Sequence, residues 1–314
     1  MTKTMFVNTS ITLSILIPCY NWDVYQLVDS LHSLCANNPR LKQFEIICAE
    51  DGSTFTFNNK KITTFSNTKY RILKNNIGRS RIRNLMAREA KYIWLLFIDC
   101  DSKITSKSFI NKYISCAINH KKNNNKTVNK HLYYGSTIYP NRAPDDKQTL
   151  HWKYGKEIES KLKHINFSSH HFLIQKILFK NYNIKFDESI KSYGYEDVFF
   201  IINNQIKAIY IKNPAFHTGL KNSSKFIKDT ESALQNLILN QKSIYQLDNK
   251  IKIIRISKLI SSLFMTNIVT YFFLIFKKKI TRNLISKSPS LFLFQFYKLG
   301  FFLLEKKRNL SKES

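Results

Sequence analysis

Two aspartates one residue apart, Asp99 and Asp101, directly follow a run of seven apolar residues at 92–98. Such a run between charged residues is typical of a strand that is buried on both faces of a parallel sheet. Because open α/β sheets bind ligands at the carboxyl ends of their strands, the two acids should face a ligand crevice. Carboxylates at this spacing can share Mg²⁺ or Mn²⁺, or one can bind the cation and the other a ribose hydroxyl. The alternative is a solvated turn that happens to contain two acids.

The strands and helices that would position these acids alternate along the first hundred residues. Strands are expected at 13–18, 44–49, 70–73 and 92–98, with helices after Asn21 and after Gly78. Right-handed crossovers between such elements predict a Rossmann-like, mostly parallel sheet. The second strand runs into Glu50 and Asp51, so a further carboxylate is placed at a strand end.

The middle of the chain is less regular. Residues 119–130 are polar and of low complexity, which predicts an exposed loop. Short strands are expected near 132–135 and 209–211, and a helix is expected around 173–181. The sequence shows no internal repeat.

Composition places the chain among basic globular proteins. Its 314 residues have room for one large α/β domain and an appendage, and 43% hydrophobic residues are enough for a sizeable core. Fifty Lys and Arg against 21 Asp and Glu give a net charge of +29, which indicates nucleic acid, an anionic membrane or phosphorylated substrates as partners.

The cysteines and the N-terminus indicate an intracellular protein. Five cysteines without a C-x-x-C pair are expected to be reduced, buried thiols rather than disulfides or a zinc site. Residues Met1 to Ser10 lack the sustained apolar core of a secretory signal. We therefore expect the working part of the protein to stay inside the cell.

The last quarter of the chain combines apolar segments with basic flanks. Lys228–Gln246 is expected to be a helix, and the apolar segments Ile256–Phe276 and Leu291–Leu304 follow it. The first apolar segment has the length of a membrane span but contains a lysine and several hydroxyl groups, and the second is too short. Because three lysines separate them, helices in the plane of an anionic membrane are the favoured interpretation. A membrane-inserted hairpin and a cytosolic oligomerisation or core surface are the alternatives.

Five further motifs accompany the acid pair. They are Pro18-Cys19-Tyr20-Asn21, Glu50-Asp51-Gly52-Ser53-Thr54, Asn76-Ile77-Gly78-Arg79-Ser80-Arg81-Ile82-Arg83-Asn84, Phe186-Asp187-Glu188 with Tyr193-Gly194-Tyr195-Glu196-Asp197, and Phe216-His217-Thr218-Gly219. Backbone amides and arginines at a helix start, as in the third motif, favour a diphosphate. In this order and spacing the motifs resemble those of the family 2 glycosyltransferases, and the resemblance extends from about Ser14 to Gly219.

The resemblance implies roles on the donor side of a site. Residues that would line the base pocket are Pro18, Tyr20 and Asn21. Asp51 would accept a hydrogen bond from the uracil or ribose, although the family's second acid is missing after Thr54. Residues that would bind the diphosphate are Gly78 and Arg83.

A divalent metal, Mn²⁺ or Mg²⁺, is also implied by the resemblance. Asp101 would bind it together with His217, while Asp99 would face the ribose or the sugar. A structural role is the alternative for a lone histidine such as His217. His170 and His171, which precede the expected middle helix, are not predicted to belong to the site.

On the acceptor side, Gly194 would let the backbone approach the sugar, and Tyr195 would stack on it. Asp197 would be the catalytic base and Glu196 would hold acceptor hydroxyls, although the two acids could exchange these roles. Adjacent acids at this place could also begin a helix, and both interpretations can hold together.

As a whole, the resemblance implies an inverting, metal-dependent hexosyltransferase of the bacterial surface-polysaccharide type. Its fold would be GT-A, an α/β fold with a mostly parallel sheet flanked by helices. Residues 10–225 would form the catalytic domain, and residues 226–314 a basic, partly apolar helical region that associates with the membrane. Asp51, Asp101 and Asp197 would converge around a single cation-bearing cleft.

The expected partners follow from this activity. The donor would be a nucleotide sugar, with UDP as the nucleotide, and the acceptor a hydroxyl of a glycan or a lipid-linked sugar. The protein would lie at the inner face of the cell membrane and would not bind nucleic acid. A nucleotidyltransferase acting on sugar phosphates is an alternative, but no glycine-rich loop follows the first strand. A non-catalytic RNA- or anionic-lipid-binding protein is the other alternative, but no recognisable motif gathers the basic residues.

Overall fold

The computed structural model describes residues 10–55, 57–123, 129–161, 167–190, 193–240 and 251–313, without the side chains of 122, 123 and 310–313. The described residues belong to two compact units. The first comprises Met1–Ile138, Leu162–Lys191 and Asp197–Gly219, and the second Tyr139–Lys161, Ser192–Glu196 and Leu220–Ser314. The second unit therefore takes in two short segments besides the C-terminal region expected from residue 226.

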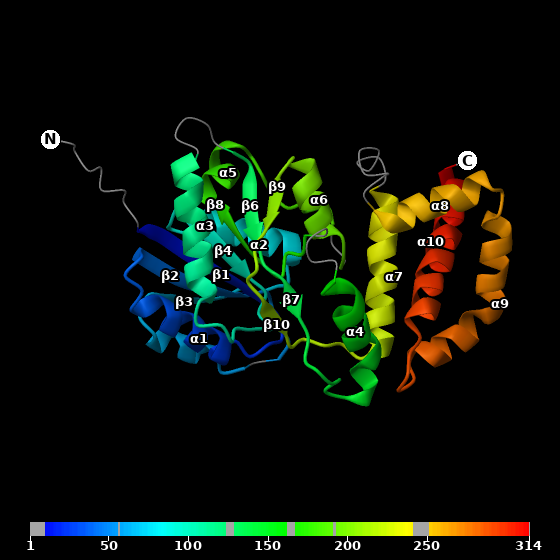
Figure 1. Cartoon of the computed structure of the whole chain (residues 1–314), viewed down its shortest axis with the longest axis horizontal. Coiled ribbons are helices and arrows are strands. Elements are labelled where there is room, and N and C mark those ends of the chain that lie inside the picture. The colour runs from blue at the N-terminus through cyan, green and yellow to red at the C-terminus, as the bar shows by residue number, and fades with distance from the viewer. Residues whose placement is uncertain are drawn as a thin grey trace. The chain divides into compact units, whose positions relative to one another are not determined.

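The first unit is built around a mixed sheet with the strand order β3-β2-β1-β4-β8-β6-β9 (Figure 1). The strands are β1 (Ile11–Cys19), β2 (Leu41–Glu50), β3 (Thr68–Ile72), β4 (Trp94–Ile98), β6 (His131–Tyr134), β8 (His171–Gln175) and β9 (Lys207–Tyr210). Only β8 runs antiparallel to its neighbours in this described sheet. The expected Rossmann-like, mostly parallel sheet is thus confirmed.

The register brings three strand ends to one edge. Cys19 pairs with Glu50, and Leu16 pairs with Phe97. Since β1, β2 and β4 run parallel, the loops that follow them leave the sheet on the same side. The residues predicted at these strand ends therefore share one edge, as ligand-binding α/β sheets require.

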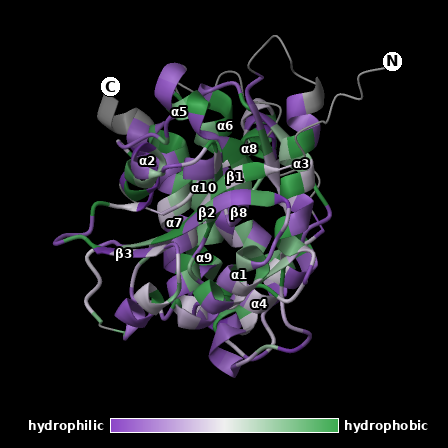
Figure 2. Cartoon of the chain, turned by 90° about the vertical axis from the view of Figure 1, so that its left-hand side faces the viewer, coloured by the Kyte–Doolittle hydropathy of each residue, from purple (hydrophilic) through white to green (hydrophobic). Residues whose placement is uncertain are grey.

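Helices cover both faces of this sheet. Helices α1 (Tyr25–Ala36) and α3 (Phe109–Asn123) pack on one face. Helices α2 (Arg79–Glu89), α5 (Lys176–Asn181) and α6 (Glu196–Asn203) contribute to the core on the other face. The flanking helices carry both hydrophobic and hydrophilic residues, as amphipathic elements do (Figure 2). A 3₁₀ turn at Asn59–Thr64 precedes β3.

Two predictions in the middle of the chain were wrong. The helix expected around 173–181 begins only at Lys176, because His171–Gln175 is the central strand β8 between β4 and β6. A short apolar run cannot distinguish a buried strand from a helix by its periodicity. The loop expected at 119–130 is helical up to Asn123, since His120 is buried with its ring edge-on to Trp94. Residues 124–128 lie outside the described residues.

A second, smaller sheet joins distant segments of the first unit. Strand β10 (Ala215–His217) pairs antiparallel with β5 (Ser102–Lys103) and parallel with β7 (Thr137–Ile138). In this register His217 lies opposite Ser102, directly after Asp101. The small sheet therefore brings the His217 motif to the acid pair.

The second unit is helical. Its α-helices are α4 (Thr149–Tyr154), α7 (Ser223–Leu239), α8 (Lys252–Ser262), α9 (Thr266–Leu284) and α10 (Leu291–Glu313), with a 3₁₀ turn at Asp146–Gln148 and a π-helical turn at Gly155–Glu159. Gly300 of α10 lies so close to Phe273 of α9 that a Cβ atom would be 2.4 Å from the ring. The helix expected at 228–246 is α7, which ends at Leu239, and residues 241–250 lie outside the described residues.

The apolar segment at 256–276 is broken in two. The chain bends by 116° between α8 and α9, at the break formed by Leu263, Phe264 and Met265. Among the described helices, none by itself has the length and apolar character of a membrane span, whereas the bent pair α8 and α9 meets that test together on length and composition alone. All five cysteines are free; Cys19, Cys35 and Cys48 are buried as expected, whereas Cys100 and Cys116 are partly exposed.

Candidate active site

The acid pair occupies a tight turn after β4. The Asp99 amide donates to the carbonyl of His170 over 2.9 Å, and the Ser102 amide donates to the carbonyl of Asp99 over 3.1 Å. Because β4 is fully buried and the turn follows at once, both side chains emerge at the carboxyl edge of the sheet. Their side chains remain about a quarter exposed, 25% for Asp99 and 24% for Asp101. The two carboxylates can therefore reach a ligand.

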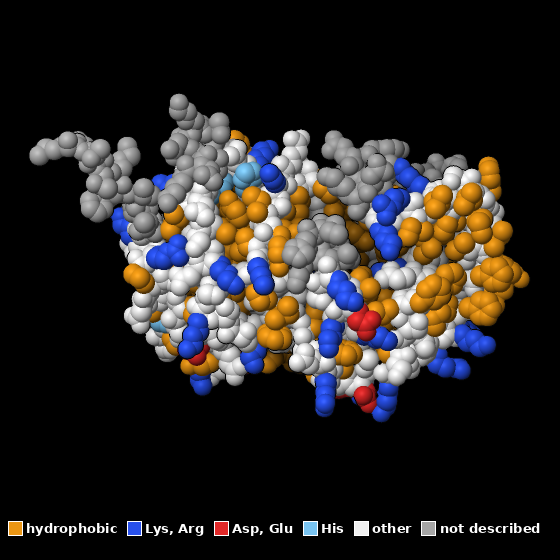
Figure 3. All heavy atoms as spheres, in the orientation of Figure 1, with side chains coloured by type: hydrophobic (Ala, Val, Ile, Leu, Met, Phe, Trp, Pro, Cys, Tyr) orange, Lys and Arg blue, Asp and Glu red, His pale blue; other side chains and the backbone are white. Residues whose placement is uncertain are grey.

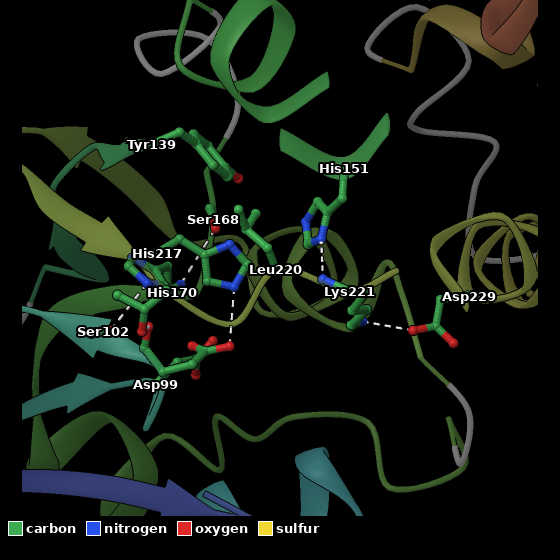
Figure 4. A network of polar contacts seen from close by, with 12 residues as sticks. Asp99, Ser102, Tyr139, His151, Ser168, His170, His217, Leu220, Lys221 and Asp229 are labelled. Atoms are coloured by element: carbon green, nitrogen blue, oxygen red, sulfur yellow. Dashed lines mark hydrogen bonds and ion pairs between the residues drawn. The ribbon is translucent and has the colours of Figure 1, made fainter. Parts of the chain in front are cut away.

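Asp101 and His217 form the centre of this site. His217 Nε2 lies 3.0 Å from Asp101 Oδ2, although 116 residues separate them in the chain. The amide and hydroxyl of Thr218 both donate to the carbonyl of Asp101, over 2.8 and 2.7 Å. A Cβ atom at Gly219 would lie 2.1 Å from Asp101 Oδ2, so only glycine leaves room for the carboxylate. Figure 4 shows His217 and His170 near Asp99 and Ser102.

The electrostatics of this pair keep Asp101 ionised. Burial would raise the pKa of Asp101, but the neighbouring His217 outweighs burial and lowers that pKa well below its usual value. An ionised carboxylate and an imidazole are both ligands of divalent cations. The carboxylate of Asp101 is therefore ionised and can bind a cation.

The geometry also fits a divalent cation that is completed by substrate. Two ligands at right angles around a cation with bonds of about 2.1 Å lie about 3 Å apart, as Asp101 Oδ2 and His217 Nε2 do. No group of three or more His, Cys, Asp or Glu among the described residues is arranged to hold a metal. Mg²⁺ commonly takes one or two protein ligands together with phosphate oxygens and waters. Asp101 and His217 would hold such an ion.

Arg83 is buried beside the acid pair. Its guanidinium is only 2% exposed, and Nη2 donates to Asp99 Oδ1 over 2.7 Å. Arg83 thus orients Asp99, which it reaches from one turn inside α2. Its predicted contact with a diphosphate stays a prediction.

The residue after Arg83 joins two motifs. Asn84 Nδ2 donates to the carbonyl of Phe186 and to Glu188 Oε1, both over 2.9 Å, and Asn84 Oδ1 accepts from the Phe186 amide. Phe186 lies 5.4 Å from the Arg83 guanidinium and stacks at 3.9 Å on Phe200 of α6. These contacts connect the acid turn to α6 through α2.

Asp51 also acts through the backbone. Its two carboxylate oxygens accept from the amides of Ile77 and Gly78, over 2.7 and 3.0 Å, and its side chain is buried. Burial raises the pKa of Asp51 in spite of these two bonds. Gly78 has a φ of +89° before the first turn of α2, a conformation that favours glycine. Asp51 thus positions the loop that begins α2. Its predicted contact with uracil or ribose stays a prediction.

The end of β1 holds a neighbouring loop. Asn21 Oδ1 accepts from the backbone amides of Thr54 and Phe55 over 2.8 and 3.0 Å. The backbone amide of Asn21 donates to Ser53 Oγ over 2.7 Å. Tyr20 is 46% exposed at the sheet edge, so its ring is free to contact a base. Pro18 lies within β1 beside Ala49. Asn21 therefore shapes the loop, and Tyr20 is the accessible residue of this motif.

The predicted acceptor motif spans the two units, because Gly194, Tyr195 and Glu196 belong to the second and Asp197 to the first. Glu196 is buried, and its Oε2 accepts from the Gly194 amide over 2.9 Å. At Gly194, φ is +108° and a Cβ atom would lie 2.2 Å from Ala233 in α7, so close packing on that helix explains this glycine. The predicted contacts of these three residues with an acceptor stay predictions.

Asp197 lies in the first turn of α6. Its Oδ1 accepts from the Val198 amide over 2.8 Å, as an acid at a helix start does. Its side chain is partly exposed, whereas that of Glu196 is buried. Of the two acids, Asp197 is therefore the accessible one. The expected convergence of Asp197 with Asp101 stays a prediction.

His170 is a residue of this region that sequence analysis missed. Its carbonyl accepts from Asp99, its Nε2 lies 3.0 Å from Ser102 Oγ, and its ring centroid lies 5.4 Å from that of His217. It is buried and holds both ends of the acid turn. Its position became visible only through the pairing of β8 with β4, because nothing in the local sequence separates it from His171.

Burial of two adjacent histidines predicts a loss of stability in mild acid. Burial lowers the pKa of His170 to about 4 and that of His171 to about 3. The unfolded chain, with histidine pKa values near 6.5, binds more protons below that pH, so stability should fall as the pH falls from about 6.5 to 4. Each histidine contributes at most about 1.4 kcal/mol per pH unit to the free energy of unfolding.

Urea unfolding at pH 7, 6 and 5 measures this effect. His171→Gln should reduce the slope, because one of the histidines with a depressed pKa is removed. His32→Gln makes the same substitution at a partly exposed histidine of α1 and is the control. An equal slope in His171→Gln and in the unaltered protein would contradict the prediction.

Comparison with known proteins gives one family match. The family model described as "Glycosyl transferase family 2" matches residues 14–182. Comparison with curated protein sequences gives no significant match.

Solved structures similar to the chain include TarS of S. aureus, with 20% identity and a TM-score of 0.48 over 73% of this chain. This chain spans only 40% of the length of that TarS chain. Structures of TarS 1–349, alone and with UDP-GlcNAc, are each 16% identical with a TM-score of 0.48, and the match covers 95% of this chain and 92% of theirs.

Proposed function

This chain belongs to glycosyl transferase family 2 and is a nucleotide-sugar glycosyltransferase, and from that premise we propose that it is an inverting, metal-dependent hexosyltransferase that uses a UDP-sugar. The observation that carries the proposal is the 3.0 Å contact between Asp101 and His217 at the carboxyl edge of the parallel sheet. An acid and an imidazole held at this place can anchor a cation and, through it, a diphosphate. The family match does not favour a nucleotidyltransferase or a non-catalytic RNA- or lipid-binding protein.

Several residues prepare the donor site. Asp51 holds the backbone at Ile77 and Gly78, where α2 begins, and the positive end of this helix favours the negative diphosphate. Arg83 fixes the carboxylate of Asp99 for a hydroxyl of the ribose or sugar. Tyr20 offers an exposed aromatic face to the base. These residues bind and orient the donor before the reaction.

Asp197 performs the proton transfer in the proposed mechanism. Its carboxylate accepts the proton of an acceptor hydroxyl while that oxygen attacks the anomeric carbon from the face opposite the diphosphate, so the configuration is inverted. Asp101 and His217 would hold the cation, which when bound supplies positive charge for the departing diphosphate. The Gly78 end of α2 adds oriented amide dipoles on the same side.

A donor panel with and without metal tests this function. The full chain with Mn²⁺ and separate UDP-sugars, UDP-GlcNAc among them, should release UDP from one donor. Chelation with EDTA should lower this release by about 100-fold or more, because a bound cation contributes several kcal/mol to transition-state stabilisation, and added Mn²⁺ should restore it. Undiminished UDP release in EDTA would overturn the metal dependence. Formation of a nucleotide sugar from a nucleoside triphosphate and a sugar phosphate would overturn the transfer reaction itself.

We also propose an acceptor and a location. The acceptor is a hydroxyl of a glycan or lipid-linked sugar in polysaccharide biosynthesis, and the protein acts at the inner face of the cell membrane. The net charge of +29 supports a negatively charged surface as its surroundings. This proposal includes no nucleic acid partner.

A further inference from the structure

A cluster of exposed hydrophobic side chains covers the junction of α8 and α9. We call it the apolar corner, and it consists of Leu263, Phe264, Met265, Ile268, Tyr271, Phe272, Leu274, Ile275 and Phe276. Figure 3 shows hydrophobic side chains gathered over α9. Single exposed hydrophobic residues are ordinary, but a contiguous group of this size marks an interaction surface.

Phe264 is the extreme case in the apolar corner. Its side chain is 92% exposed, and its backbone has a φ of +56°. A bulky residue rarely adopts this left-handed conformation, because it is strained. The bend between α8 and α9 thus directs an aromatic ring into solvent at an energetic cost.

The opposite face of α9 completes the core of the second unit. Thr270, Phe273, Ile280 and Leu284 are buried at helical spacing, and Phe273 packs edge-on against Tyr297 of α10 with ring centroids 5.3 Å apart. The outward face is therefore not needed for packing within the unit. Its hydrophobic residues are available to a partner.

Basic residues continue the outward face beyond the apolar corner. At 100° per residue, Lys278, Lys279 and Arg282 lie on the same side of α9 as Ile268 and Ile275. The three basic side chains are exposed and form no ion pair with another described residue. One half of this helix face is thus apolar and the other half is positively charged.

We propose that the apolar corner and the basic half of α9 dock together on an anionic lipid bilayer, with the apolar corner inserted into one leaflet. This inference deepens the proposed location and rests on it. The apolar part of α9, from 266 to 276, is about 16 Å long, which is half of the roughly 30 Å hydrocarbon core. The lysines that follow would then lie among the lipid headgroups.

Charge favours a bilayer over a second copy of the chain. Two copies would each bring a net charge of +29 and three exposed basic groups beside the contact, so they would repel each other. An anionic leaflet satisfies both halves of the face at once. Hydrocarbon accepts the apolar corner, and phosphate groups accept Lys278, Lys279 and Arg282.

Vesicle co-sedimentation of the full chain tests the proposal. Binding should be strong to phosphatidylcholine vesicles that contain phosphatidylglycerol, weak to phosphatidylcholine alone, and weaker at high salt. The double variant Phe264→Ser with Ile275→Ser should lower the partition coefficient by about tenfold or more. Lys278→Glu with Lys279→Glu should also lower it by about tenfold or more.

Matched controls separate this surface from general effects. Phe292→Ser removes a ring that is 80% exposed at the start of α10, outside the apolar corner. Lys60→Glu with Lys61→Glu makes the same charge change on exposed lysines of the first unit. Phe292→Ser should lower vesicle binding by less than twofold, and Lys60→Glu with Lys61→Glu should lower it by less than threefold.

Three outcomes would overturn the proposal. The first is that the full chain does not bind anionic vesicles. The second is that the control variants lose as much vesicle binding as the corner variants, by which we mean Phe264→Ser with Ile275→Ser and Lys278→Glu with Lys279→Glu. The third is that the full chain forms a stable oligomer that only the corner variants dissociate. UDP release from a soluble donor should be unchanged in the corner variants, so this assay reports on the proposed function separately. Absence of UDP release by the unaltered chain would refute the proposed glycosyltransferase function. Vesicle binding would still test the membrane proposal independently.

Discussion

Asp101→Ala should lower sugar transfer by about 1,000-fold. Removal of the carboxylate leaves His217 alone to hold the cation, and a loss of about 4 kcal/mol of transition-state stabilisation corresponds to three powers of ten in rate. Steady-state turnover of the donor with saturating Mn²⁺ measures the loss. Isothermal titration of Mn²⁺ together with UDP should show weaker binding in the same variant.

Gly219→Ala provides an independent test of the same site. The added methyl group would lie 2.1 Å from Asp101 Oδ2 and would force the carboxylate to move, while Asp101 and His217 both remain in the chain. Turnover should fall in this variant, whereas Gly300→Ala, which crowds Phe273 in the second unit, should affect stability rather than Mn²⁺ binding. Full turnover and unchanged Mn²⁺ binding in Asp101→Ala would remove the metal assignment.

Asp197→Asn should lower kcat by about 10²–10⁴-fold while the affinity for the nucleotide stays the same, because only general-base catalysis is lost. The amide preserves the shape of the side chain and its oxygen can still accept from the Val198 amide. Single-turnover kinetics and titration with UDP separate the chemical step from binding. Asp29→Asn, on an exposed position of α1, is the matched control and should retain activity.

A variant of Glu196 tests which of the two adjacent acids is the catalytic base. Glu196 is buried and accepts from Gly194, so Glu196→Gln should reduce activity less than Asp197→Asn and should mainly lower stability. A larger loss of kcat in Glu196→Gln, with nucleotide affinity retained, would assign the base to Glu196. Normal turnover in Asp197→Asn would exclude Asp197 from proton transfer.

Local patterns were sufficient to predict the parallel strands β1 to β4 and the acids at their edge of the sheet. A buried strand ending in Asp99 and Asp101 is recognisable because its hydrophobic run stops at charge, and parallel strands present their ends together. The parallel direction of β1, β2 and β4 followed from the alternation of strands and helices. These features depend on residues that are close in sequence or on general rules of topology.

The partners of individual side chains could not be predicted in this way. Arg83 and Asp51 belong to recognisable motifs, yet the structure pairs them with Asp99 and with the backbone at Gly78. His170 becomes a neighbour of the acid turn only when β8 inserts beside β4. Such contacts depend on which strands become adjacent, and a single sequence contains no local signal for that choice.

The break between α8 and α9 also lacks a sequence signal. Its residues are Leu263, Phe264 and Met265, with neither glycine nor proline to interrupt a helix. Continuous hydrophobicity therefore predicted one long segment. The cost of the bend is visible only in the backbone of Phe264.

The small sheet has a consequence for how the protein matures. Asp101 and His217 meet only when β10 pairs with β5, which closes a loop of more than one hundred residues. Loops of this length close slowly, because closing the loop reduces the conformational entropy of the chain before any native contact has formed to compensate for that loss. A ribosome-bound chain that has emerged as far as β9 would already contain the strands of the large sheet but would have no ligand pair. The proposed cation site is thus completed only by β10, which follows all the strands of the large sheet along the chain.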